Sequence, residues 1–132
     1  PAALDLFAGT GSISLELLSR GCSRVVSVER DAQHYAFICQ CLDRLSDTHS
    51  QPVRADVFAF VQRCRQQFDI VFADPPYALP EIADLPDIIL TSGILAPDGI
   101  FILEHGASND FSRHPRLVDH RCYGSVNFSL FR

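Results

Sequence analysis

Short apolar runs alternate with amphipathic segments along the first half of the chain. The runs are only a few residues long and rich in β-branched or aromatic residues, which favours buried strands over helices. They predict strands at 1–7, 24–29, 52–55 and 70–73. The segments between them carry apolar residues at helical spacing and predict helices at 12–20, 32–45 and 57–64. Strands that alternate with helices indicate an α/β fold with a largely parallel sheet.

The second half of the chain carries stronger turn signals. Residues 78–86 are interrupted by proline and predict a loop that enters a helix over 87–91. Pro97-Asp98-Gly99 is a turn signal, and an apolar run at 100–104 predicts a fifth strand. Two further strands, 116–123 and 125–131, flank Gly124 and suggest a terminal antiparallel hairpin. A polar connection is expected over 46–51.

Composition limits the class of protein. The chain has 132 residues, of which 47% are hydrophobic and 20% charged, so we expect one compact domain over 1–132. Neither a membrane span nor a secretory signal is visible, and the 5 cysteines form no CxxC pair, which favours reduced thiols in a cytoplasmic protein. The formal net charge of −5, with arginine as the sole basic type besides histidine, disfavours extensive phosphate contacts.

The stretch FDIVFADPPY at 68–77 carries the most specific chemistry. Two consecutive prolines end the strand, fix φ near −65° and hold the preceding Asp74 extended. The result is a stiff corner at the carboxyl end of a buried strand, where open α/β sheets bind their ligands. Asp74 and the Pro75 carbonyl can accept hydrogen bonds from an exocyclic amine, while the Tyr77 ring can stack on the plane that bears it. An ordinary Pro-Pro turn is the alternative interpretation.

A glycine turn follows the first strand. Gly9 and Gly11 let the backbone approach a ligand, and the helix that Ser12 is expected to cap offers free N–H groups. The third glycine of a dinucleotide fingerprint is absent, because Ser14 occupies its position. Asp5 at the strand end suits a cationic ligand such as S-adenosylmethionine better than a phosphate.

Acids also end the second and third strands. Glu29 lies 18 residues after Gly11, near the spacing at which such an acid binds ribose hydroxyls. Asp31 is the rival acid, although we interpret it as the cap of the next helix. Asp56 could accept a hydrogen bond from an adenine amine or cap the helix that follows, and one residue can do both.

With DLFAGTG, DPPY and acids at four successive strand ends, the chain resembles the class I S-adenosylmethionine-dependent methyltransferases. More narrowly it resembles the RsmD-like family, which methylates the exocyclic N2 of a guanine in 16S ribosomal RNA. The resemblance implies a Rossmann-like, mostly parallel seven-stranded sheet in the order 3-2-1-4-5-7-6, with an antiparallel last strand and helices on both faces. Members of that family begin with a basic N-terminal arm, so we expect a segment upstream of the first strand.

The resemblance also implies roles for individual residues. Asp5 and the turn at 7–11 would hold the methionine part of the cofactor, Glu29 the ribose, and Asp56 with Val57 the adenine. The cofactor set it implies is Asp5, Phe7, Ala8, Gly9, Thr10, Gly11, Glu29, Arg30, Asp56 and Val57. The target guanine would be gripped by Asp74, Pro75, Pro76 and Tyr77. The cofactor would be S-adenosylmethionine, the product S-adenosylhomocysteine, and no metal would be needed. The protein would act as a monomer, and its partner would be 16S rRNA in a small-subunit assembly particle.

Three other functions fit parts of the pattern. A DNA adenine or cytosine amino-methyltransferase would use the same DPPY corner. An NAD-binding oxidoreductase would be expected to have a third glycine in the turn and no acid in the place of Asp5. A cofactor-binding domain without catalysis is favoured by the low basic charge and by a missing arm. A panel of RNA and DNA substrates separates the two kinds of methyltransferase. Calorimetry with S-adenosylmethionine and with NAD separates a methyltransferase from an oxidoreductase.

Overall fold

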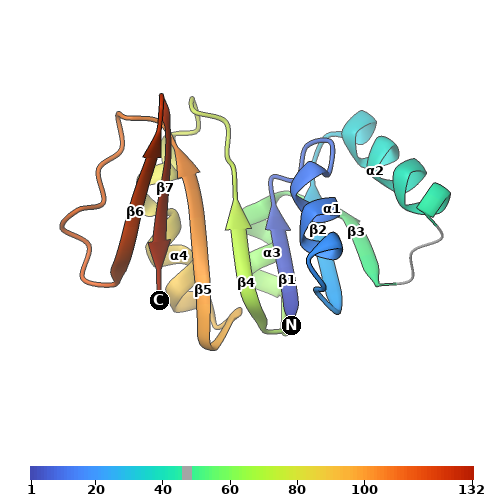
Figure 1. Cartoon of the computed structure of the whole chain (residues 1–132), viewed down its shortest axis with the longest axis horizontal. Helices are drawn as coiled ribbons and strands as arrows, with labels where there is room; N and C mark the ends of the chain where they lie inside the picture. The colour runs from blue at the N-terminus through green and yellow to red at the C-terminus, as the bar shows by residue number, and fades with distance from the viewer. Residues whose placement is uncertain (46–48) are drawn as a thin grey trace.

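A computed structural model of the chain describes residues 1–45 and 49–132 and contains one seven-stranded sheet. The strand order is β3-β2-β1-β4-β5-β7-β6, which confirms the predicted order (Figure 1). β1 to β5 run parallel, and β7 is antiparallel to both β5 and β6. The strands are β1 Ala2–Leu6, β2 Arg24–Glu29, β3 Ser50–Arg54, β4 Phe68–Ala73, β5 Leu95–His105, β6 Leu117–Tyr123 and β7 Val126–Phe131.

Helices lie on both faces of the sheet. In Figure 1, α1 lies in front of β1 and β2, whereas α3 and α4 lie behind the sheet. Among the described residues, no helix combines the length and the apolar character needed to cross a membrane. The helices are α1 Ser12–Ser19, α2 Ala32–Leu45, α3 Val57–Arg63 and α4 Leu85–Ser92, with a 3₁₀ turn, η1, at Pro80–Asp84.

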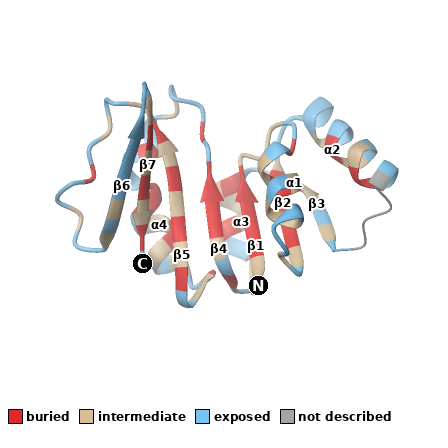
Figure 2. Cartoon of the chain, viewed as in Figure 1, coloured by how far each residue is buried: buried red, intermediate tan, exposed pale blue. Residues whose placement is uncertain are grey.

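The core is centred on the middle strands. Residues 3–6 of β1 are all buried, and β4 buries its last three residues, as Figure 2 shows for both strands. Strands covered by helices on both sides carry mostly apolar residues, and Asp5 is the one polar residue in these two stretches. By contrast, β7 buries alternate residues and β6 is mostly exposed. The most deeply buried strands, β1 and β4, are therefore interior strands of the sheet.

Because β1 to β5 are parallel, their carboxyl ends lie at one edge of the sheet, which is the upper edge in Figure 1. The register brings the ends of neighbouring strands level with one another. Leu6, the last residue of β1, pairs with Val28 of β2 and with Ala73, the last residue of β4. The segments that carry the glycine turn and the DPPY corner therefore leave the sheet side by side.

Several element boundaries differ from those predicted. Gly11, not Ser12, caps α1, because its φ of 85° lies in the left-handed region that glycine adopts at little cost. The predicted turn at 97–99 lies within the bounds of β5, where the pairing with β4 shifts register between Leu95 and Ile100 and Asp98 has a φ of 65°. Of the predicted connection over 46–51, residues 46–48 lie outside the described residues and β3 begins at Ser50.

The predicted loop and helix after the DPPY corner are also corrected. The helix begins at Leu85, two residues earlier than predicted, and η1 precedes it. Pro86 lies in the first turn of α4, where a missing N–H breaks no helical hydrogen bond. Proline therefore marks the start of this helix and not the end of a loop. The terminal hairpin is confirmed, and Gly124 turns it at a φ of 62°.

Candidate active site

A cavity of about 1040 Å³ opens at the carboxyl edge of the sheet. It is lined by the ends of β1, β2 and β4, by the start of α3 and by the residues that follow each strand. Every residue predicted for the site lines it except Gly11. Asp5 and Asp74, which the sequence predicts to face a common cavity, both line this one. The cavity therefore brings the glycine turn, the acids and the DPPY corner together.

The glycine turn is held in left-handed backbone conformations. The φ angles are 59° at Phe7, 57° at Gly9 and 85° at Gly11, and the Gly11 N–H donates to the Ala8 carbonyl at 2.9 Å. A Cβ on Gly9 would meet no atom within 4 Å, so open space lies beside the backbone there. A Cβ on Gly11 would instead lie 3.1 Å from Ile38 of α2. The lack of a side chain at Gly9 leaves room in the cavity, whereas the lack of one at Gly11 lets the start of α1 pack against α2.

Asp5 is a carboxyl group that the fold buries almost completely, with 1% of its surface exposed. Ser14 of α1 donates a 2.7 Å hydrogen bond to Asp5 Oδ2, and its hydroxyl lies 2.6 Å from that of Ser27 in β2. Burial raises the Asp5 pKa to about 6 in spite of the Ser14 hydrogen bond, and the charges of Asp74 and Glu29 add to the rise. A cation in the cavity would therefore stabilise the ionised form of Asp5.

Glu29 holds the glycine turn. Its Oε1 accepts the Gly9 N–H at 2.8 Å, and its Oε2 accepts the Asp31 N–H at 2.8 Å. Each carboxylate oxygen has a second lone pair, so a ribose hydroxyl could still donate to it. Asp31 accepts the His34 N–H at 2.9 Å at the start of α2, which is the capping role predicted for it.

Asp56 caps α3. Its Oδ2 accepts the Ala59 N–H at 3.1 Å, while the residue also lines the cavity. Val57, the first residue of the helix, is buried and reaches the same cavity. Both interpretations of Asp56 are therefore compatible with its position. Arg30 and Thr10 are exposed residues of the same lining.

The DPPY corner presents its acid and its ring at the mouth of the cavity. Asp74 is exposed, Pro75 is buried, and the Pro76 carbonyl accepts the Leu79 N–H at 2.9 Å in the following turn. Tyr77 is 54% exposed. A Cβ on Gly106 would lie 3.4 Å from the Tyr77 ring, so the ring rests on the backbone just after β5. Tyr77 therefore offers one aromatic face outward.

Sequence reasoning missed a fifth acid, Glu104, which lines the same cavity. Burial, a hydrogen bond to Asp74 and the charge of Asp74 raise the Glu104 pKa to about 7. The signal in the sequence is that Glu104 is the last residue of the predicted fifth strand, so it too is an acid at a strand end. His105 points into the core at 1% exposure, where its ring bonds Ser129 at 2.7 Å and burial lowers its pKa.

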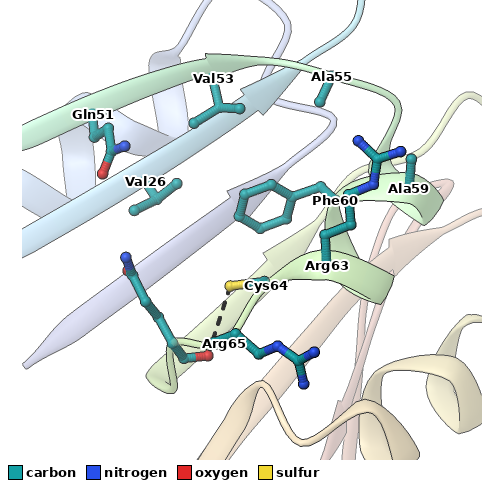
Figure 3. Close-up of a pocket in the computed structure, with 10 residues that line it drawn as sticks. Val26, Gln51, Val53, Ala55, Ala59, Phe60, Arg63, Cys64 and Arg65 are labelled. Carbon is teal, nitrogen blue, oxygen red and sulfur yellow. Dashed lines mark hydrogen bonds between the residues drawn. The ribbon is translucent and has the colours of Figure 1, made fainter.

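A second cavity, of about 380 Å³, lies between α3 and the strands β2 and β3 (Figure 3). Its lining is mostly apolar at Val26, Val53 and Phe60, and Figure 3 shows the Cys64 thiol turned back to the main chain. None of the acids or glycines of the sequence motifs reaches it. The chemistry predicted from the sequence belongs to the larger cavity.

The family model described as conserved hypothetical protein 95 matches residues 1–132. Among curated proteins, "Putative rRNA methyltransferase YlbH" of Bacillus subtilis is 33% identical over 106 residues, which are 77% of this chain and 58% of that protein. "Ribosomal RNA small subunit methyltransferase D" of Escherichia coli is 25% identical over 132 residues, which are 98% of this chain and 67% of that protein. The chain thus spans about three fifths to two thirds of the length of these relatives.

A solved structure of a conserved hypothetical protein from Streptococcus pyogenes has the same fold. Its TM-score is 0.89 at 23% sequence identity, and the match covers 98% of this chain and 84% of that chain. At this identity the likeness concerns the fold alone. It extends over nearly all of the described elements, including the terminal hairpin.

Proposed function

The chain belongs to the RsmD-like family of S-adenosylmethionine-dependent methyltransferases, and from that premise we propose that it methylates the exocyclic N2 amine of a guanine in 16S rRNA. The names of the relatives support RNA of the small ribosomal subunit as the substrate. An assembly particle, in which the target base is accessible, would be the partner. The protein would act as a monomer in the cytoplasm.

The residues of the larger cavity fit S-adenosylmethionine. The open space beside Gly9 admits a ligand close to the backbone, and the nearly buried Asp5 carboxylate suits the amino group of the methionine part. Glu29 would accept hydrogen bonds from the ribose, while Asp56 and the Val57 N–H would bind the adenine. Phe7, Ala8, Thr10 and Arg30 complete the wall of the site, and Gly11 shapes the turn. When bound, the cofactor supplies a methyl group on a positively charged sulfur.

The DPPY corner would position the target amine. Asp74 and the Pro75 carbonyl accept the two N–H groups, which draws the nitrogen lone pair out of conjugation with the ring and aims it at the methyl carbon. Pro76 stiffens the corner, and Tyr77 stacks on the base. The cofactor would supply the methyl group to N2 and would depart as the neutral thioether, and Asp74 would accept the proton that N2 gives up. Orientation and preorganised electrostatics provide most of the rate.

One observation carries the proposal. Asp5 and Asp74 line one cavity, and Tyr77 beside them is 54% exposed. A buried Tyr77, or acids on separate surfaces, would leave no place where a sulfonium and an aromatic amine could meet. The acidic net charge of −5 means that phosphate contacts are few or come from elsewhere in the assembly.

The test is a methylation assay with labelled S-adenosylmethionine on small-subunit particles, followed by mapping of the modified base. We expect one N2-methylguanine from wild-type protein and none from Asp74→Ala, which should still bind the cofactor in calorimetry. Asp84→Ala is the control, because Asp84 is exposed, lies outside the cavity and makes no side-chain cap. Activity that survives Asp74→Ala would refute the role of Asp74.

A DNA panel in the same assay tests the alternative substrate. Methylation of adenine N6 or cytosine N4 in DNA, without methylation of the particle, would replace the proposed function by a DNA amino-methyltransferase. Cofactor binding without transfer to any of these substrates would instead indicate a binding domain. Calorimetric binding of NAD in place of S-adenosylmethionine would contradict the proposal altogether.

A further inference from the structure

Glu104 and Asp74 stand next to each other at the rim of the cavity. Leu103 of β5 pairs with Ala73, the last residue of β4, so the residues that follow them, Glu104 and Asp74, are neighbours. Both acids line the cavity, and a hydrogen bond to Asp74 and the charge of Asp74 both contribute to the raised pKa of Glu104. A hydrogen bond between two carboxyl groups requires that one of them carry a proton.

The surroundings of Glu104 favour such a shared proton. Asp74 and Tyr77 are the titratable groups that face it, and neither supplies a positive charge. Its neighbour on β7 is the uncharged Phe128. Beyond that, Arg121 of β6 is already bonded to Asp119 at 3.1 Å. Burial and the neighbouring Asp74 raise the pKa of Glu104 to about 7, so the pair keeps one proton below neutral pH and loses it above.

The hydrogen-bonding edge of the target base determines whether the pair of carboxyl groups keeps this proton or loses it. Guanine presents N1–H beside the N2 amine, which makes two adjacent donors. Adenine and cytosine present a ring nitrogen acceptor beside their amine. Two ionised carboxylates match the guanine edge, whereas an acceptor edge requires the pair to keep its proton and donate it.

We propose that Glu104 is a specificity-determining residue that accepts the N1–H of guanine while Asp74 accepts from N2. The inference rests on the proposed function and adds to it the reason for the choice of base. Binding of guanine replaces the shared proton by two N–H donors, and that proton leaves to solvent. A base with a ring acceptor at this position leaves one carboxyl group protonated and its amine poorly aimed.

Carbon-13 NMR of carboxyl-labelled full-length protein, saturated with S-adenosylhomocysteine, tests this without turnover. We expect the Glu104 signal, identified by its loss in Glu104→Gln, to titrate near pH 7. Saturating guanosine monophosphate should lower that midpoint by at least about one pH unit. The monophosphate of 2-aminopurine riboside, which has the N2 amine but a ring acceptor at N1, should leave it unchanged or raise it. Equal responses to the two nucleotides, or no response to either, would overturn the proposal.

Kinetics on small-subunit particles give a second readout. Glu104→Gln should raise KM about 10-fold with a smaller change in kcat and should abolish the pH dependence of kcat/KM near pH 7. Glu81→Gln, an exposed site outside the cavity, should match wild type. A Glu104→Gln enzyme with the KM and pH profile of wild type would overturn the proposal. Should wild-type protein methylate no particle, the proposed function fails, and the NMR titration still decides the role of Glu104.

Discussion

Ser14 donates a 2.7 Å hydrogen bond to the carboxyl group of Asp5, and both residues are 1% exposed. Ser14 occupies the position of the third glycine in dinucleotide-binding turns. Here its hydroxyl links the strand acid to Ser27 and so joins α1, β1 and β2. The departure from the glycine pattern therefore has a structural purpose, which is to hold a buried acid where a cationic ligand can reach it.

Asp5→Asn should weaken S-adenosylmethionine binding and stabilise the free protein. Loss of one partner of a buried charge pair costs about 2 kcal/mol or more, so we expect Kd to rise at least roughly 30-fold in calorimetry. The pKa of Asp5 in the folded protein, about 6, exceeds the ordinary aspartate pKa of 3.8, so Asp5 favours folding below pH 3.8 and loses that contribution as the pH rises through 6.

The stability of Asp5→Asn relative to wild type should therefore depend on pH. At pH 8 the variant avoids a buried charge and should be more stable by up to about 3 kcal/mol, an advantage that vanishes near pH 4. Urea unfolding at both pH values measures this difference. A constant difference between the two proteins would mean that Asp5 does not titrate as its burial suggests.

Ser14→Ala should destabilise the protein in the same pH window but with the opposite sign. Removing a hydrogen bond to a charged group costs about 1.5–3 kcal/mol, and the cost applies while Asp5 is ionised. We expect a larger loss of unfolding free energy at pH 8 than at pH 5. Ser19→Ala is the matched control, since its hydroxyl donates to the Glu16 carbonyl on an exposed part of α1. Equal effects of the two substitutions would contradict the Ser14–Asp5 coupling.

Gly11→Ala and Gly21→Ala separate backbone strain from site geometry. Both glycines have positive φ, 85° and 94°, so each substitution should cost about 1–2 kcal/mol. A Cβ on Gly11 would lie 3.1 Å from the Ile38 side chain, whereas a Cβ on Gly21 would meet no atom within 4 Å. Gly11 is also the N-cap of α1, at the end of the glycine turn. Thermal melts should show a loss for both variants, with the larger loss for Gly11→Ala. Cofactor affinity should fall for Gly11→Ala alone.

Tyr77 should contribute through its ring and not through its hydroxyl. Base stacking on an aromatic side chain is worth about 1–3 kcal/mol, so Tyr77→Ala should lower kcat/KM on particles by roughly 5- to 150-fold. Tyr77→Phe keeps the ring and should remain near wild type. Cofactor affinity should be unchanged in both, because Tyr77 lies at the mouth of the cavity. A Tyr77→Phe enzyme as slow as Tyr77→Ala would assign the function to the hydroxyl.

Much of the fold could be predicted from local pattern. The apolar runs, the glycine turn and the prolines each act over a few residues, so they indicate strands and corners before any tertiary contact is known. Parallel strands have their carboxyl ends at one edge of the sheet, so the acids at those ends were expected to lie close together. Asp5, Glu29, Asp56 and Asp74 do gather at one cavity for that reason.

The boundaries that were wrong depended on contacts distant in sequence. Gly11 caps α1 in place of Ser12, at a position where a Cβ would lie only 3.1 Å from Ile38 of α2. The turn residues 97–99 fall inside β5 because that strand pairs with β4 on both sides of them. Local turn residues are tolerated inside a strand when the partner strand supplies the hydrogen bonds on either side.

The sequence by itself determined the chemical groups that are available. They are acids at four strand ends, a glycine turn after the first strand and a rigid aromatic corner after the fourth. Only the tertiary structure decided which of those groups meet. Ser14 reaches Asp5 because α1 crosses over β1, and Glu104 reaches Asp74 because β5 is in register with β4. Register and packing are properties of pairs of segments, and the protonation of an acid depends on such pairs, so neither is visible in a single stretch of residues.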